Sequence, residues 1–113
     1  MSAIAALRRQ RIVEDLMVER GRQEALLAEG RFAFTCADED IYDHTKLAVL
    51  VEEVGEVSRV LCDSFNNDEL DLYSLRRELV QVAAVAVAWI EAVDAQPTAE
   101  EVGKPLGSAE ESA

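Results

Sequence analysis

Carboxylates stand inside an apolar helical pattern of this chain. The segment "KLAVLVEEVGEVSRV", residues 46–60, has the spacing of a buried helix but contains Glu52, Glu53 and Glu56. On a helical wheel of about 100° per residue, Glu53 lies at the centre of the apolar stripe and Glu56 at its edge. Burying an isolated carboxylate charge is costly, so such groups are normally paired with a cation or bound to a metal. These glutamates are therefore candidate metal ligands.

A second segment carries a matching pair of oxygen-bearing side chains. Glu78 lies on the apolar face of its predicted helix, and Gln81 flanks it one turn further on. If the two helices form an antiparallel hairpin that turns near residues 66–68, Glu56 faces Glu78 and Glu53 lies level with Gln81. Oxygen ligands without His or Cys favour Mg²⁺ or Mn²⁺. The pattern therefore predicts a site for one of these two cations.

Ion pairs are the alternative to a metal site, and the pattern leaves both interpretations open. The cations nearest to these acids in the sequence are Lys46, Arg59, Arg76 and Arg77. Because Arg76 and Arg77 adjoin Glu78, we expect them to project to other sides of the helix and to leave the acids unneutralised. Glu91 and Asp94 also match an ExxD spacing. The hairpin register places them several turns from the other acids, and we expect a solvated helix end there.

Three helices are predicted to position these side chains. Their expected ranges are residues 2–28, 43–63 and 74–94. Gly30 is a suitable stop for the first helix. Asp43 or Thr45 is the expected N-cap of the second, and Asp71 or Ser74 the expected N-cap of the third.

Composition defines the class of protein. The 113 residues suffice for one domain, and abundant Ala, Leu, Val, Glu and Arg with few Gly and Pro predict an all-α fold. The net charge of −12 disfavours binding to a nucleic-acid polymer. We expect a helical domain over residues 1–95. The segment 96–113 contains both prolines and several acids, which predicts a disordered acidic tail.

Several features predict a cytoplasmic protein. The longest uncharged run, residues 79–90, is too short to span a bilayer. Charges follow soon after the first apolar residues, so we expect no signal peptide and no membrane partner. Cys36 and Cys62 are isolated in the sequence and are expected to be reduced thiols, although their spacing leaves a disulfide open.

Two short motifs of this chain resemble those of a known family. "EEVGE" at 52–56 followed by "ELVQ" at 78–81 resembles the EExxE…ExxD signature of the MazG-like, all-α nucleoside triphosphate pyrophosphohydrolases. The 21 residues between the motifs fit the usual gap, and "ERGRQ" at 19–23 is similar to a segment that often precedes it. The resemblance covers residues 15–94. It implies a MazG-like bundle with three main helices per chain, assembled as an oligomer.

The resemblance also implies an activity. Family members hydrolyse a nucleoside triphosphate to a nucleoside monophosphate and pyrophosphate with Mg²⁺, and this chain would do so in nucleotide-pool cleansing. Glu53, Glu56 and Glu78 match the metal ligands, and Glu52 matches the leading glutamate, either a base that orients water or a group behind the ligands. Gln81 stands where the family has Asp, and its neutral amide weakens the site. The alternative is a non-catalytic MazG-like module that binds a nucleotide or a protein partner.

Several further side chains are candidates to contact the substrate. Lys46 lies two turns before Glu53 on the same face and is a candidate phosphate contact, while Gln23 and Arg22 are candidates to line the pocket. The aromatic side chains that either stack on a base or belong to the core are Phe32, Phe34 and Trp89. Because the third helix is apolar almost all round, we expect a homodimer or homotetramer.

Overall fold

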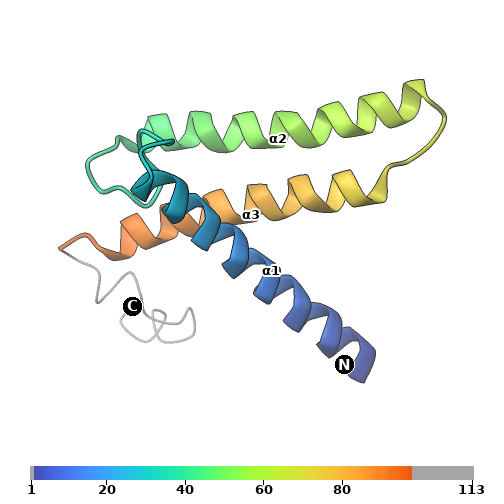
Figure 1. Cartoon of the computed structure of the whole chain (residues 1–113), viewed down its shortest axis with the longest axis horizontal. Coiled ribbons are helices and arrows are strands. Elements are labelled where there is room, and N and C mark those ends of the chain that lie inside the picture. Colours follow the sequence, from blue (N-terminus) through green and yellow to red (C-terminus); the bar gives the residue numbers. More distant parts are fainter. Residues whose placement is uncertain (1, 98–113) are drawn as a thin grey trace, which may run out of the picture.

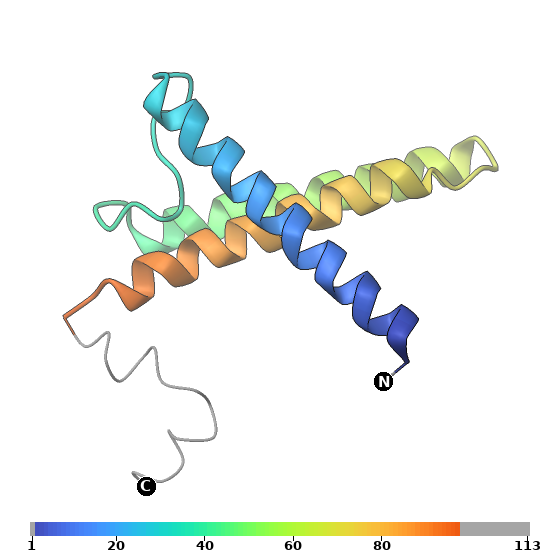
Figure 2. The same ribbon diagram turned by 60° about the horizontal axis from the view of Figure 1, so that its bottom comes forward.

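The computed structural model describes residues 2–97, which form three α-helices and no strand. These are α1 (Ala3–Ala28), α2 (Asp43–Asn66) and α3 (Leu72–Asp94). Helices α2 and α3 lie side by side as an antiparallel hairpin, and α1 crosses this hairpin obliquely and packs mainly on α3 (Figures 1 and 2). The predicted all-α class and the three helices are thus confirmed.

The sequence predicted no membrane-spanning segment and a disordered tail over residues 96–113. None of the described helices combines the length and the apolar character that a membrane span requires. The predicted tail over 96–113 lies almost entirely outside the described residues, which end at residue 97.

Helix ends follow the predicted capping chemistry at two places. Asp71 is the N-cap of α3: its carboxylate accepts from the backbone N–H of Ser74 at 3.0 Å and from the Ser74 hydroxyl at 2.7 Å. Helix α1 ends at Ala28, and Gly30 has a φ of +77°, the left-handed conformation that glycine adopts without strain. Both features were visible in the sequence because they depend on local hydrogen bonds.

The start and end of α2 differ from the prediction. Tyr42 is its N-cap and makes no side-chain capping hydrogen bond, so the prediction of Asp43 or Thr45 was wrong. Helix α2 also continues to Asn66, three residues further than expected. The Ser64 hydroxyl donates to the carbonyl of Val60 at 2.8 Å, which accommodates this polar residue inside a continuing helix.

The core is small and is built around α3. Its buried apolar residues are Cys36, Ala84, Val85, Ala88 and Ala92, and Val49, Leu50 and Trp89 pack against it. The three alanines follow an i,i+4 spacing and therefore lie on one stripe of α3. Small side chains along this stripe allow neighbouring segments to approach the helix closely.

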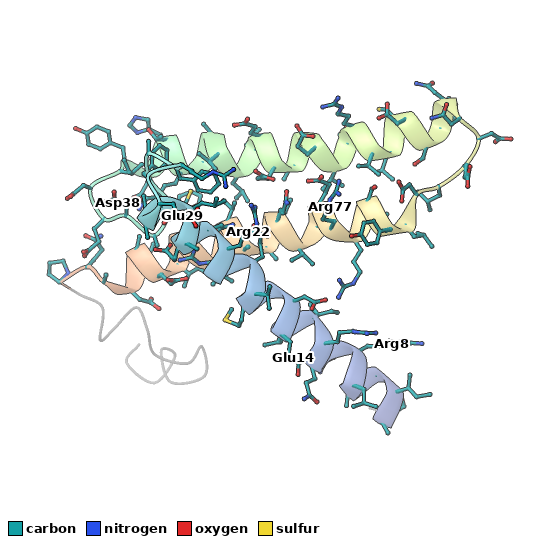
Figure 3. All side chains as sticks on the ribbon, in the orientation of Figure 1. Arg8, Glu14, Arg22, Glu29, Asp38 and Arg77 are labelled. Atoms are coloured by element: carbon teal, nitrogen blue, oxygen red, sulfur yellow. The ribbon has the colours of Figure 1, made fainter. Side chains whose placement is uncertain are left out.

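Large apolar side chains remain on the surface of α2. We call them the α2 stripe: Leu47, Val51, Val54, Leu61 and Phe65, all exposed. Steps of four, three, seven and four residues place them along one side of the helix, centred about 120° around from Glu53. Exposed Leu79 and Ile90 show that α3 is likewise not covered all round. The described chain therefore leaves much apolar surface in contact with water. Figure 3 shows how side chains project from the outer sides of all three helices.

Candidate functional site

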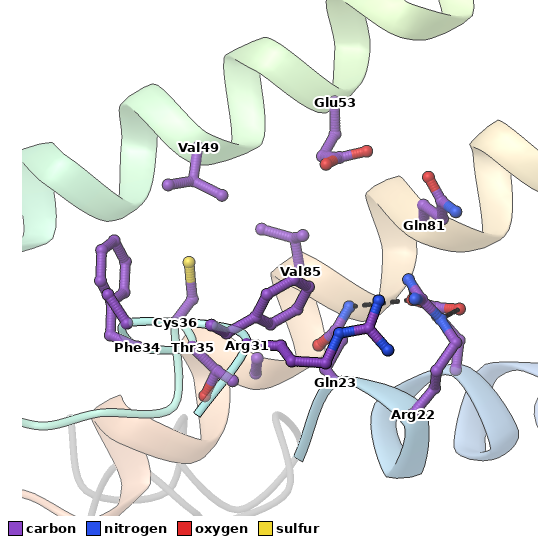
Figure 4. Close-up of a pocket in the computed structure, with 14 residues that line it drawn as sticks. Arg22, Gln23, Arg31, Phe34, Thr35, Cys36, Val49, Glu53, Gln81 and Val85 are labelled. Atoms are coloured by element: carbon purple, nitrogen blue, oxygen red, sulfur yellow. Dashed lines mark hydrogen bonds and ion pairs between the residues drawn. The ribbon is translucent and has the colours of Figure 1, made fainter. Parts of the chain in front are cut away.

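A cavity of about 310 Å³ opens where α1, α2, α3 and the connection 29–42 meet (Figure 4). Val49, Val85 and Ala88 form part of an apolar wall. Polar side chains also line it, namely Glu19, Arg22, Gln23, Arg31, Glu53 and Gln81. This volume lies at the lower end of the range of small-molecule sites, and an apolar wall with a few converging polar groups is typical of them. The cavity is therefore the candidate site of this chain.

Glu53 and Gln81 face one another across this cavity. Glu53 points from α2 toward α3, and Gln81 points from α3 toward α2 (Figure 4). The Oε2 atom of Glu53 is buried and has no hydrogen-bond partner among the described residues. A buried carboxylate oxygen without a donor is costly, so each such group needs an explanation.

The electrostatic surroundings of Glu53 are negative. Burial raises the pKa of its carboxyl above the ordinary value of 4.5, and Glu78, Glu52, Glu56 and Glu19 raise this pKa further, in that order. Since like charges disfavour the ionised form, four neighbouring glutamates make this position attractive to a cation. The two helices thus concentrate negative charge at the edge of the cavity.

Glu56 and Glu78 lie beside the cavity and do not line it. Glu78 is only 9% exposed, and its Oε1 accepts from Arg77 Nη2 at 3.5 Å. Glu56 lies 3.7 Å from Arg59 Nη1. The expectation that Arg77 would point away from Glu78 was wrong, because its long, flexible side chain brings Nη2 within 3.5 Å of the Glu78 carboxylate. Arg76 does project elsewhere and pairs with Asp15 of α1 at 2.7 Å.

The four predicted metal ligands are thus divided between two environments. Within residues 2–97, no group of three or more His, Cys, Asp or Glu side chains lies close enough together to hold a metal ion. The oxygen chemistry nevertheless fits a hard cation, since Glu53 has an unpartnered buried oxygen and carboxylates that repel it. Glu52, the predicted catalytic residue, is exposed on α2 beside Glu53.

The predicted substrate contacts are also divided. Gln23, Phe32 and Phe34 line the cavity. Lys46 lies outside its lining and is buried, with 2% exposure. Trp89 packs against the core, and its indole N–H donates to Asp43 Oδ1 at 2.9 Å. For Trp89 the structure therefore shows a core contact, one of the two roles that the sequence left open.

Sequence reasoning named Phe32 and Phe34 but missed the other residues that the connection 29–42 contributes. This segment supplies Arg31, Thr35 and the buried Cys36 to the cavity, and burial raises the pKa of the Cys36 thiol. No local pattern could have revealed these residues, because a loop has no periodicity that says which side chains face inward.

A buried arginine beside the cavity was missed as well. Arg20, 6% exposed, donates from Nε to Glu91 Oε2 at 2.7 Å and from Nη2 to Glu91 Oε1 at 3.0 Å. It also donates to Glu24 Oε2 at 2.9 Å and to Gln23 Oε1 at 2.8 Å. Glu91 and Asp94 are exposed, as expected of a solvated helix end, but Glu91 also pairs with Arg20 and so joins α3 to α1.

Comparisons of the chain with models of protein families, with curated proteins and with solved structures found no match in any of the three.

Proposed function

We propose that this chain is a MazG-like, Mg²⁺-dependent pyrophosphohydrolase that acts on the cytoplasmic nucleotide pool. It would cleave a nucleoside triphosphate between the α and β phosphates and release a nucleoside monophosphate and pyrophosphate. The observation that carries the proposal is the buried Oε2 of Glu53, which has no partner among the described residues and lies opposite Gln81 in a cavity of ligand size. The EExxE motif and the ELVQ segment support the same assignment.

Glu53, Glu56, Glu78 and Gln81 would hold the cation. The arginine contacts of Glu56 and Glu78 are long, at 3.7 and 3.5 Å. The Glu56–Arg59 pair is largely exposed to solvent, and such pairs contribute about 0–1 kcal/mol, so exchanging this pair for a cation costs little. Gln81 would contribute a neutral carbonyl oxygen. When bound, Mg²⁺ neutralises phosphate oxygens and makes a water molecule more acidic. Glu52 is the candidate acceptor for the proton of that water.

The rest of the cavity suits the remainder of a nucleotide. Arg22 and Arg31 bring positive charge to its lining, and guanidinium groups bind phosphate well. Phe32 and Phe34 offer aromatic surface to a base. Because Lys46 lies outside this lining, its predicted phosphate contact has less support than that of the two arginines.

The direct test is to incubate the protein with a panel of ribonucleoside and deoxyribonucleoside triphosphates in Mg²⁺ or Mn²⁺ and to measure pyrophosphate. We expect release from at least one nucleotide, with a loss of 100-fold or more in Glu53→Ala, since positioned metal ligands support the chemical step. Glu69→Ala, at an exposed position between α2 and α3, is the matched control and should keep full activity. No release from any nucleotide, with Glu53→Ala indistinguishable from the unaltered protein, would overturn the proposal.

A non-catalytic module that binds a nucleotide or a protein partner is the second candidate. Gln81 favours it, because a neutral side chain takes the position where the signature has a carboxylate. The non-catalytic module is also favoured because an arginine lies within 4 Å of Glu78 and another within 4 Å of Glu56. This protein would keep the fold and the cavity but would not turn over a triphosphate.

We further propose that the chain assembles as a homodimer or homotetramer. The α2 stripe is exposed along most of the helix, up to 87% at Phe65, and monomeric proteins rarely expose large contiguous apolar patches. A second copy presents the same stripe and can cover it through a two-fold interface.

A further inference from the structure

The amide group of Gln23 has a defined orientation in the cavity wall. Its side chain is 8% exposed, and one of its two polar atoms lies 2.8 Å from Arg20 Nη1. A guanidinium carries only hydrogen-bond donors, so the amide atom that faces it must be the acceptor Oε1. The Nε2 atom, with its two protons, is therefore directed away from Arg20.

Arg20 is itself held in place. Glu91 binds it through two hydrogen bonds of 2.7 and 3.0 Å, and Glu24 accepts a third at 2.9 Å. Glu24 Oε2 also accepts from the Thr35 hydroxyl at 3.0 Å, and the Thr35 hydroxyl accepts from the N–H of Ala37 at 3.2 Å. The Thr35 proton is thus already used within the protein, which leaves Gln23 as the better donor for a ligand.

The Nε2 protons of Gln23 are only weakly engaged. Their one partner among the described residues is Glu19 Oε2, at 3.5 Å. Glu19 is occupied by Arg22, which donates to its two oxygens at 2.9 and 2.8 Å. A 3.5 Å contact lies beyond the usual range of N–H···O hydrogen bonds, so a ligand acceptor can compete for these protons.

We infer that Gln23, with its amide oriented by Arg20, donates a hydrogen bond to an acceptor atom on the ring of the cavity's ligand and so selects among ligands of similar size. With the proposed function, on which the identity of the ligand rests, this ring is a nucleobase whose carbonyl oxygen or ring nitrogen faces Gln23. Arg20 is a positioning residue in this scheme, because it acts on the ligand through the Gln23 amide and does not contact the ligand itself.

Substitution of Gln23 by glutamate isolates the hydrogen bond. A glutamate at this position has the same shape and still accepts from Arg20, but its second oxygen accepts where the amide donates. A site built around a buried donor strongly rejects ligands that fail to accept from it, since the buried donor is then left unpaired. The variant should therefore disfavour the ligand that the unaltered protein prefers.

The experiment measures kcat and KM for pyrophosphate release from ATP, GTP, CTP and UTP, and the affinity for the four nucleosides in EDTA by calorimetry. In Gln23→Glu we expect a loss of at least 10-fold in kcat/KM for the preferred nucleotide, mainly through KM, and a changed order of preference. Gln10→Glu, at an exposed position of the same helix, is the control and should keep the order. In Arg20→Lys a single ammonium group cannot bind Glu91 and Gln23 at the same time. This variant should show smaller differences in kcat/KM among the four nucleotides.

The two readouts separate this inference from the proposed function. Absence of pyrophosphate release with a 10-fold weaker nucleoside affinity in Gln23→Glu would reject the proposed function and support the inference. Pyrophosphate release with the same order of preference in Gln23→Glu and the unaltered protein would overturn the inference and leave the function standing. If Gln23→Glu fails to fold, Gln23→Met removes the donor without adding charge. In that variant an unchanged order of nucleotide preference, or an unchanged affinity for the nucleosides, would also overturn the inference.

Discussion

Arg20 of α1 and Glu91 of α3 are joined by two hydrogen bonds, of 2.7 and 3.0 Å, although 71 positions separate them in the chain. This pair ties the crossing helix to the hairpin beside the cavity. It also explains how an arginine that is only 6% exposed keeps its charge satisfied.

Breaking this pair should destabilise the fold. We expect Glu91→Ala to lower the free energy of unfolding by about 1.5 kcal/mol, because two charge-assisted hydrogen bonds are lost and a buried guanidinium loses its main partner. Urea denaturation at pH 7 measures the change. Asp94→Ala, which removes an exposed acid three residues further along α3, should change stability by less than about 0.5 kcal/mol. Equal effects of the two substitutions would show that the ion pair contributes nothing specific.

Glu53 should make stability depend on pH. Its pKa lies above the ordinary 4.5 in the folded protein, so the folded state binds this proton more tightly than the unfolded chain does. The stability contribution of this group is therefore complete below pH 4.5 and is lost as pH rises through the folded pKa. We expect Glu53→Gln to raise the free energy of unfolding at pH 7 by about 1 kcal/mol and to leave it nearly unchanged at pH 4.

Thermal unfolding at several pH values between 4 and 7 checks this prediction. Glu69→Gln removes the same formal charge from an exposed position and serves as the control for the general effect of net charge. We expect Glu53→Gln to be more stable than the control, and we expect this difference in the free energy of unfolding to grow as pH rises. A gap that stays constant over this range would contradict the prediction.

Gln81 should limit the affinity for metal. In Gln81→Asp a carboxylate replaces the neutral amide opposite Glu53, so we expect Mg²⁺ to bind at least 10-fold more tightly and turnover to increase. Calorimetric titration with Mg²⁺, and Tm measured with and without Mg²⁺, test this, because a ligand that binds the folded state raises Tm. Gln96→Asp, at an exposed position beyond α3, controls for added charge.

The outcomes of this substitution distinguish the candidate functions. Tighter Mg²⁺ binding with a gain in turnover indicates an enzyme with a weakened metal site. Unchanged metal binding and unchanged turnover favour the non-catalytic module. A purely structural, ion-paired set of glutamates gives no Mg²⁺-dependent rise in Tm in either protein.

The α2 stripe should mediate assembly. We expect a mass of two or four chains by size-exclusion chromatography with light scattering, and a shift toward the single chain in Leu61→Lys, because a charge in an apolar interface is costly to desolvate. Ala48→Lys places the same charge at an exposed position off the stripe and should leave the mass unchanged. A single-chain mass for the unaltered protein would contradict the assembly.

Local patterns accounted for the helices and part of the site. The 3.6-residue repeat predicted three helices and put Glu53 and Gln81 on facing sides of a hairpin, and both indeed line one cavity. Asp71 and Gly30 were identifiable as helix ends because capping and left-handed turns depend on a few neighbouring residues. These features need no knowledge of how distant segments meet.

Other features depended on distant segments and on flexible side chains. A helical wheel gives the direction of a Cβ atom but not the path of a long side chain, which is why the reach of Arg77 to Glu78 was missed. The start of α2 was also missed: Tyr42 is the N-cap, and the Asp43 carboxylate accepts from Trp89 of α3 instead of capping the helix. Periodicity assigns residues to the face of a helix, yet it does not say which other helix or loop will cover that face.

The cavity has one wall that local periodicity determines and one that it does not. The positions of the acids on α2 and α3 follow from the sequence alone, since a repeat of 3.6 residues places each carboxylate relative to its own helix. The opposite wall required the crossing of α1 and the path of the connection 29–42, which bring Gln23, Arg31 and Cys36 to the same space. Those positions follow from long-range packing and from the Arg20–Glu91 contact, and no local repeat encodes such contacts.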